Sequence, residues 1–266
     1  MDIAGYLASI FVGIALGLIG GGGSILTVPM LVYLFSLDAV LATAYSLFIV
    51  GATSVVGSFS YFKKGLVNIK TAIVFGIPSI AAIFLTRHYI LPAISQHVFT
   101  IGSYTVTKNI LLMLLFAVLM IVASYSMIKK DDGKSNEEAP KRQSLNYFQI
   151  LMQGIFIGVI TGLIGAGGGF LIIPALVNLL RLPMKTAVGT SLVIISINSL
   201  MGFLFSLSHT SVQWRFLLSI AAIAIIGILI GSYLSTKIKA NRLKSAFGWF
   251  VLVMGIYIII KETILK

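Results

Sequence analysis

Two runs of glycine are the features of this sequence best suited to binding chemistry. Each run precedes a short apolar segment that contains a proline. A helix that begins at such a break presents free backbone N–H groups and the positive end of its dipole, and this combination binds anions. Glycine also lets the backbone approach a ligand closely. We expect Ser24 to cap its helix and to offer a hydroxyl. The predicted contacts at the breaks 20–24 and 165–169 are Gly21, Gly22, Gly23, Ser24, Gly167, Gly168 and Gly169.

A stripe of hydroxyl and amide side chains follows each glycine run. The stripes comprise Thr43, Tyr45, Ser46, Thr53 and Ser54 in the first half and Thr190, Ser191, Ser196, Asn198 and Ser199 in the second. Ser46 and Ser54 are eight residues apart, so they share one helix face. Such groups can coordinate an anion without a fixed charge, although they also form hydrogen bonds between helices. The predicted ligand contacts are Tyr45, Ser46, Thr190, Ser191 and Asn198.

The sequence lacks the residue patterns of catalysis, metal binding and nucleotide binding. It has no cysteine, and its histidines (His88, His97 and His209) fall in predicted loops without a metal-binding spacing. The hydroxyls have no companion base, and no Gly-Lys-Ser/Thr follows the glycines. We expect no enzyme activity, catalytic residue, metal or cofactor. The charged residues at the ends of apolar segments are interpreted as interfacial anchors; these are Asp38, Arg87, Arg181, Lys185 and Glu262.

Composition places these features in a membrane. Of 266 residues, 58% are hydrophobic and 10% charged, with mean hydropathy +1.07. Soluble domains average about 25% charged residues. The net charge of +12 arises from residues between apolar segments, where it sets orientation instead of binding nucleic acid. The expected apolar segments are 3–19, 25–37, 40–62, 71–91, 109–128, 147–164, 170–181, 186–207, 215–236 and 245–260.

The two halves of the chain are copies of one another. Shifted by 145 residues, 13–57 matches 158–202 at 19 of 45 positions without a gap. Duplicated membrane halves are typical of secondary transporters. We predict a first repeat at 1–128, a linker at 129–146 and a second repeat at 147–266. Glycines four apart, as in Gly13 and Gly17, Gly158 and Gly162, and Gly227 and Gly231, are expected to serve helix packing.

Charge in the loops predicts how the halves are oriented. Loops 63–70, 129–144 and 237–244 are rich in lysine and arginine and should be cytoplasmic, whereas 92–108 and 208–215 should lie outside. Each half then has five segments with one hairpin that returns to its own side, so the halves are inverted. The linker 129–146 would be cytoplasmic and both termini outside. The alternative, eight spans with parallel halves, would place 237–244 outside.

The motifs GLIGGGGSILTVPMLVYL (17–34) and GLIGAGGGFLIIPALVNL (162–179), with ATAYSL (42–47) and AVGTSL (187–192), resemble the signature of the sulfite exporter TauE/SafE family. The resemblance covers both halves. It implies a permease of the bacterial or archaeal cytoplasmic membrane for sulfite, sulfoacetate or other small organic anions. Tyr45 and Ser24 depart from the small residues that the family commonly has there.

The sequence therefore predicts an all-helical polytopic transporter with two inverted repeats and Gly-broken, discontinuous helices. An anion (a sulfur oxyanion, sulfonate or carboxylate) would bind between the breaks, and alternating access would follow from rocking one repeat against the other. An anion channel of the same topology stays open as the alternative. The expected partners are this anion and the lipid bilayer, with no nucleic acid, and a homo-oligomer stays open.

Overall fold

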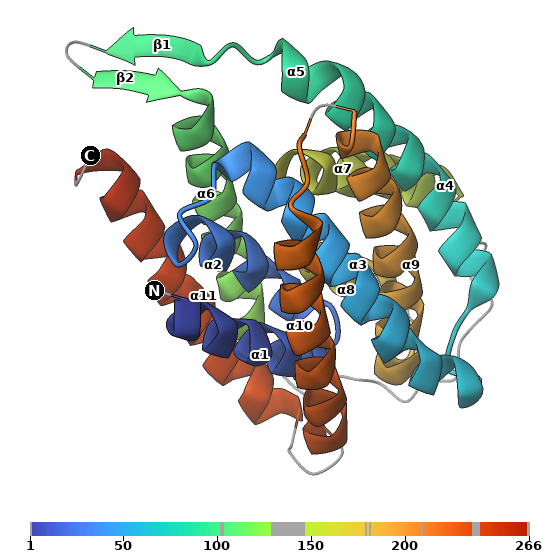
Figure 1. The fold of residues 1–266 in the computed structure, drawn as a ribbon. Helices are drawn as coiled ribbons and strands as arrows, with labels where there is room; N and C mark the ends of the chain where they lie inside the picture. Colours follow the sequence, from blue (N-terminus) through green and yellow to red (C-terminus); the bar gives the residue numbers. More distant parts are fainter. Residues whose placement is uncertain are drawn as a thin grey trace.

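Helices make up most of the part of the chain that the computed structural model describes, which comprises residues 2–101, 104–128, 147–178, 180, 182–208, 210–235 and 240–264 (Figure 1). The predicted linker 129–146 lies outside the described residues, as do Arg181, His209 and the first part of loop 237–244.

The described residues of the first half form six α-helices, two short turns of other helix types and one β-hairpin. The 3₁₀ turn η1 follows the first glycine run, and the π-helical turn η2 continues α4. In chain order the elements are α1 (Asp2–Ile19), η1 (Gly22–Leu26), α2 (Thr27–Tyr33), α3 (Ala39–Lys63), α4 (Ile69–Leu85), η2 (Thr86–Ile90), α5 (Leu91–Ala93), β1 (His97–Ile101), β2 (Tyr104–Thr107) and α6 (Lys108–Ile128).

The second half repeats the pattern with α7 (Tyr147–Ile164), α8 (Gly169–Asn178), α9 (Met184–Ser206), α10 (Trp214–Ser235) and α11 (Ala240–Thr263). Local signals in the sequence set several helix starts. Asp38 caps α3, because its Oδ1 accepts a hydrogen bond of 2.9 Å from the Val40 N–H. Asn68 caps α4 in the same way through the Thr71 N–H, at 3.1 Å.

The antiparallel hairpin of β1 and β2 corrects the expectation of a loop at 92–108. Its residues are rich in Val, Thr, Phe, Ile and Tyr, which favour strands. Hydropathy alone did not reveal it because both strands are short. α6 begins directly after it, and the Lys108 N–H donates to the Gln96 carbonyl at 3.1 Å.

Equivalent helices of the two halves pack antiparallel. Helix α3 lies against α9, with Gly51 beside Leu200 and Gly189 beside Tyr61 (Figure 1). Helix α6 lies against α11, with Gly248 beside Met127 and Gly255 beside Ala117. Inverted halves, which the sequence analysis predicts, would place equivalent helices in an antiparallel arrangement of this kind.

The glycines spaced four apart serve helix packing, as the sequence predicted. A Cβ placed on Gly13 would lie 2.2 Å from the Ala224 carbonyl oxygen, and one on Gly231 would lie 2.2 Å from that of Ile14. In the other half a Cβ on Gly158 would lie 2.4 Å from the Ser79 carbonyl oxygen. Backbones therefore touch along α1–α10 and along α7–α4, two interfaces that the 145-residue shift exchanges.

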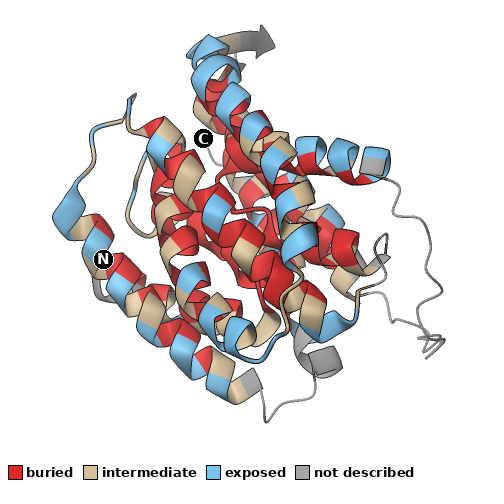
Figure 2. Ribbon diagram, turned by 90° about the vertical axis from the view of Figure 1, so that its right-hand side faces the viewer, coloured by how far each residue is buried: buried red, intermediate tan, exposed pale blue. Residues whose placement is uncertain are grey.

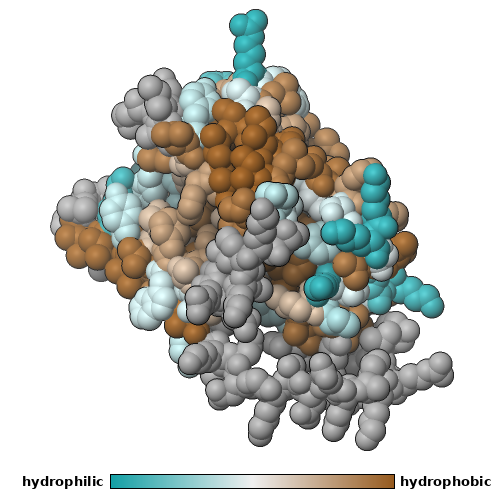
Figure 3. Space-filling model, turned by 90° about the horizontal axis from the view of Figure 1, so that it is seen from below, coloured by the Kyte–Doolittle hydropathy of each residue, from teal (hydrophilic) through white to brown (hydrophobic). Residues whose placement is uncertain are grey.

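The outer faces of the bundle are apolar. Figure 2 shows buried residues in the centre and exposed ones on the outward helix faces. The exposed residues include Phe11, Phe59, Ile77, Leu229 and Val253, each at least half exposed. Figure 3 shows broad apolar areas on the face seen from below. Among the described residues, six helices are long and apolar enough to cross a membrane, and they are 39–63, 69–93, 108–125, 184–206, 214–234 and 245–263. These outer faces therefore suit lipid as their solvent.

Candidate functional site

Both glycine runs break a helix where the chain needs left-handed backbone. After α1 ends at Ile19, Gly20 and Gly21 have φ of +68° and +46°. After α7 ends at Ile164, Gly165, Gly167 and Gly168 have φ of +73°, +67° and +69°. Residues with a side chain rarely adopt these φ angles, so glycine is the residue that permits both breaks. The predicted discontinuities at 20–24 and 165–169 are present.

The two breaks meet inside the bundle. A Cβ on Gly169 would lie 2.4 Å from the Gly21 carbonyl oxygen and 2.6 Å from the Gly21 Cα. Gly23 lies equally close to the backbone of α1, since its Cβ would be 2.4 Å from the Leu16 nitrogen. Gly22 faces the β-branched side chain of Ile19, whose Cγ2 would lie 2.8 Å from an added Cβ. All residues of both runs are buried, so side chains at Gly21, Gly23 or Gly169 would push these backbones apart.

Helices α3 and α9 enclose the meeting point. The repeat-mates Val50 and Ile195 touch it: a Cβ on Gly167 would lie 2.6 Å from Val50 Cγ1, and one on Gly21 would lie 2.5 Å from Ile195 Cδ1. Ser46 and Ser54 stand one turn on either side of Val50, and therefore on the same face of α3. Both serines are completely buried, and neither hydroxyl has a hydrogen-bond partner.

Two further unpartnered hydroxyls adjoin the second break. A Cβ on Gly167 would lie 2.9 Å from Ser199 Oγ, and one on Gly168 would lie 2.4 Å from Thr161 Oγ1. Both side chains are buried without a hydrogen-bond partner. Buried polar groups in proteins are almost always hydrogen-bonded to protein or ordered water, so these unpartnered hydroxyls mark the second break as a candidate binding site. Thr161 was not selected from the sequence, because it stands alone on α7 and belongs to neither polar stripe.

Four of the five predicted hydroxyl contacts form hydrogen bonds within the protein. The Ser24 hydroxyl donates to the Gly21 carbonyl at 2.7 Å, and that of Ser191 to the Val188 carbonyl at 2.8 Å. Tyr45 Oη accepts from the Gln213 N–H at 2.7 Å, and Thr190 Oγ1 from the Asn68 N–H at 2.9 Å. The capping prediction for Ser24 is wrong, because η1 begins at Gly22 and α2 at Thr27, and Ser24 lies inside η1.

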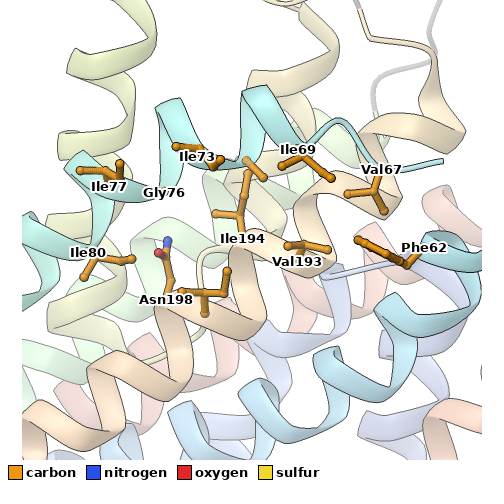
Figure 4. A pocket seen from close by; sticks show the side chains of 12 residues that line it. Phe62, Val67, Ile69, Ile73, Gly76, Ile77, Ile80, Val193, Ile194 and Asn198 are labelled. Carbon is orange, nitrogen blue, oxygen red and sulfur yellow. The ribbon is translucent and has the colours of Figure 1, made fainter. Parts of the chain in front are cut away.

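Asn198 lies between the bundle interior and an outer groove. Its Nδ2 donates to Ser79 Oγ at 2.7 Å, and its buried Oδ1 has no partner. Figure 4 shows the side chain between α9 and α4, near Ile80, in a groove of about 360 Å³ lined mainly by isoleucine and valine. Because the rest of this groove is apolar, it does not resemble an anion site.

The interpretation as interfacial anchors is wrong for Arg87 and Glu262. Arg87 is 3% exposed and Glu262 is 2% exposed. Arg87 Nη1 donates to Thr43 Oγ1 at 3.1 Å, and the Tyr33 hydroxyl donates to Glu262 Oε1 at 3.0 Å. Lys185 is exposed, as expected of an anchor. The positions of Arg87 and Glu262 in the sequence do not show that they are buried, because their burial depends on helices that are far away in the chain.

Comparison with known proteins agrees with this architecture. The family model for the sulfite exporter TauE/SafE matches residues 6–258. A probable membrane transporter protein of Xylella fastidiosa (strain 9a5c) is 30% identical over 93% of this chain and 91% of its own length. Proteins of the same description are 25% identical in Bacillus subtilis (strain 168), over 91% of each chain, and in Methanocaldococcus jannaschii, over 96% of this chain and 94% of the relative.

No solved structure matches the chain. The family match spans nearly the whole sequence, and the described helices include six candidate membrane spans. The chain is thus a multi-pass membrane protein that belongs to the TauE/SafE sulfite exporter family of transporters.

Proposed function

We propose that the protein carries a small anion, such as sulfite or an organosulfonate, across the cytoplasmic membrane by alternating access. The anion binds where the glycine breaks meet between α3 and α9. The observation that carries this proposal is the set of buried hydroxyls without partners beside the second break, at Thr161 and Ser199. A sulfur oxyanion offers several acceptor oxygens, so it could satisfy these donors together.

The exchange of contacts between the halves supports the transport mechanism. The repeat-mates Gly20 and Gly165 contact Val188 and Thr43, which are also repeat-mates. Each break therefore packs on the opposite half. A rocking motion that opens one of these contacts and closes the other would expose the site to the two sides in turn, which is the general logic of inverted-repeat carriers. The proposed orientation has the linker 129–146 in the cytoplasm and both termini outside.

The direct test is flux in proteoliposomes that contain the purified protein. The panel comprises labelled sulfite, methanesulfonate, sulfoacetate and acetate, each with and without a pH gradient. We expect saturable uptake of at least one sulfur anion and acceleration by the same anion on the opposite side, because a carrier returns faster when loaded. Flux that never saturates and shows no counterflow would identify a channel. Absence of flux for the whole panel would refute the proposed substrate class.

Removal of one unpartnered hydroxyl should weaken transport without destabilising the fold. Ser199→Ala should lower the initial sulfite flux about fivefold, the effect of losing one hydrogen bond of roughly 1 kcal/mol. Its melting temperature should stay level or rise, since no existing bond is lost. Ser196→Ala is the matched control on the same helix, because Ser196 Oγ already donates to the Val193 carbonyl at 2.8 Å. Equal flux in the two variants would remove Ser199 from the site.

A further inference from the structure

Arg87 is a buried cation whose hydrogen-bond partner, Thr43, touches the second glycine break. It occupies η2, the π-helical turn at the end of α4, and only 3% of its surface is exposed. Short π-helical turns within α-helices occur frequently at functional sites. A guanidinium enclosed within a membrane domain is costly unless polar or charged groups surround it. The contacts around Arg87 therefore need to account for its charge.

The hydrogen bonds of Arg87 leave one edge of the guanidinium unused. Nη1 donates to Thr43 Oγ1 at 3.1 Å, and the Thr43 hydroxyl in turn donates to the Val40 carbonyl at 2.8 Å. Nε and Nη2 are both enclosed, and neither has a hydrogen-bond partner. No carboxylate among the described residues bonds this side chain. Its positive charge is consequently buried and unneutralised within the part of the chain that the structure describes.

The two unused donors are suited to one type of ligand. Nε–H and the adjacent N–H of Nη2 point in the same direction from the planar guanidinium, while Nη1 lies on its other side. Parallel donors of this kind bind two oxygens of one carboxylate or oxyanion at once. A sulfite, sulfonate or carboxylate presents such a pair of oxygens, whereas a halide does not. Thr43 holds the opposite nitrogen and so keeps the donor pair oriented.

Contacts on both sides of Arg87 place it beside the second break. Thr43 touches the first residue of that break, since a Cβ on Gly165 would lie 2.6 Å from the Thr43 Cβ. Thr86, next to Arg87 in the chain, touches the end of α7, because a Cβ on Gly162 would lie 2.7 Å from the Thr86 Cβ. Arg87 is therefore linked to the second break through Thr43, which bonds its guanidinium and touches Gly165.

The duplicated fold does not require an arginine at this position. The shift of 145 residues places Ser232 at the position of Arg87 and Val188 at that of Thr43. Both breaks pack on the opposite half, Gly165 on Thr43 and Gly20 on Val188. Arg87 and Thr43 thus occur in the first half alone. The equivalent contact, between Gly20 and Val188, forms without an arginine or a hydroxyl.

We propose that the Nε/Nη2 edge of Arg87 binds two oxygens of the transported anion at the second glycine break, with Thr43 as a positioning residue. This inference rests on the proposed transport of a small anion and restricts its substrates to anions with two oxygens on one centre. It also predicts one charged anion site per chain. The Arg87 guanidinium then provides the positive charge, and the hydroxyls near Gly167 and Gly168 provide further hydrogen bonds to the anion.

Binding to purified protein in nanodiscs tests this proposal separately from transport. Titrations use sulfite, methanesulfonate, acetate and chloride, with wild type, Arg87→Gln and Arg87→Lys. We expect wild type to bind the three oxyanions and not chloride. Arg87→Gln should raise the sulfite Kd at least about thirtyfold, and Arg87→Lys about tenfold, because lysine keeps the charge but loses the paired donors. Arg215→Gln, the same change at an exposed position, should leave the Kd unchanged.

The melting temperature without anion distinguishes binding from a structural role. Arg87→Gln should be at least as heat-stable as wild type, since it removes an unneutralised buried charge. A lower melting temperature with an unchanged sulfite Kd would overturn the inference while leaving the proposed function standing. If wild type neither binds nor carries any member of the panel, both proposals fail together. If neither Arg87 variant folds, the sulfite Kd of Thr43→Val is the test. An unchanged Kd in that variant would also contradict the role assigned to Arg87.

Discussion

Gly169→Ala is expected to reduce anion flux on the order of 10- to 100-fold, the effect of overpacking worth about 1–3 kcal/mol at the site. The added methyl carbon would lie 2.4 Å from the Gly21 carbonyl oxygen. Because the obstacle is backbone, no side chain can rotate to relieve the contact, and the two breaks must separate. The φ of Gly169 does not lie in the left-handed region, so the effect reports this contact alone. Sulfite flux per inserted molecule in proteoliposomes measures it.

Gly76→Ala is the matched control for this substitution. Gly76 lies inside α4, and a Cβ placed there has no neighbour within 4 Å. The same methyl group should therefore leave flux unchanged. Wild-type flux in Gly169→Ala would show that contact between the breaks is not needed for transport, and it would remove the main geometrical support for the site between α3 and α9.

Among the substitutions described, Gly231→Val is expected to lower the thermal stability of the fold the most. Its Cβ would lie 2.2 Å from the Ile14 carbonyl oxygen and 2.9 Å from the Ile14 Cα, so α1 and α10 could not keep their distance. Overpacking of about 3 kcal/mol would lower the melting temperature by on the order of 10 °C. Thermal melting followed by size-exclusion chromatography measures the fraction that stays monodisperse.

The comparison with Gly76→Val separates this contact from a general intolerance of valine in membrane helices. Gly76→Val should melt within about 2 °C of wild type, a shift below that of 1 kcal/mol in a protein of this size. If the two variants melt together, then α1 and α10 are held by something other than close backbone packing, and the small-residue interpretation of Gly227 and Gly231 is wrong.

Several features could be predicted from the sequence because they depend on local patterns. Long apolar segments identify membrane helices without knowledge of their neighbours. The breaks were predictable because consecutive glycines at 20–23 and 167–169 oppose a continuous helix. The repeat also implied that the polar stripes of α3 and α9 occupy equivalent places. The short strands at His97–Ile101 and Tyr104–Thr107 were missed, because apolar and polar residues are mixed there over too few positions.

Assignment of individual site residues was less reliable, because it depends on partners distant in the chain. Tyr45 and Gln213 are 168 residues apart, and their hydrogen bond leaves that hydroxyl engaged with the segment before α10. Thr190 is similarly engaged with Asn68. Nothing in a polar stripe distinguishes such hydroxyls from Ser46, whose hydroxyl has no partner. The stripe therefore predicts the region of a site but not which of its members are free.

Local patterns in the amino-acid sequence are enough to identify a duplicated helical membrane protein of the TauE/SafE family, with two glycine breaks that interrupt its helices. These properties follow from composition, periodicity and self-similarity along the chain. The contact between Gly21 and Gly169 and the burial of Arg87 beside Thr43 are visible only in the folded molecule. The reason is physical: burial and hydrogen-bond satisfaction belong to pairs of elements packed in space, and a residue near the end of an apolar segment is either solvated or enclosed according to which helices cover it.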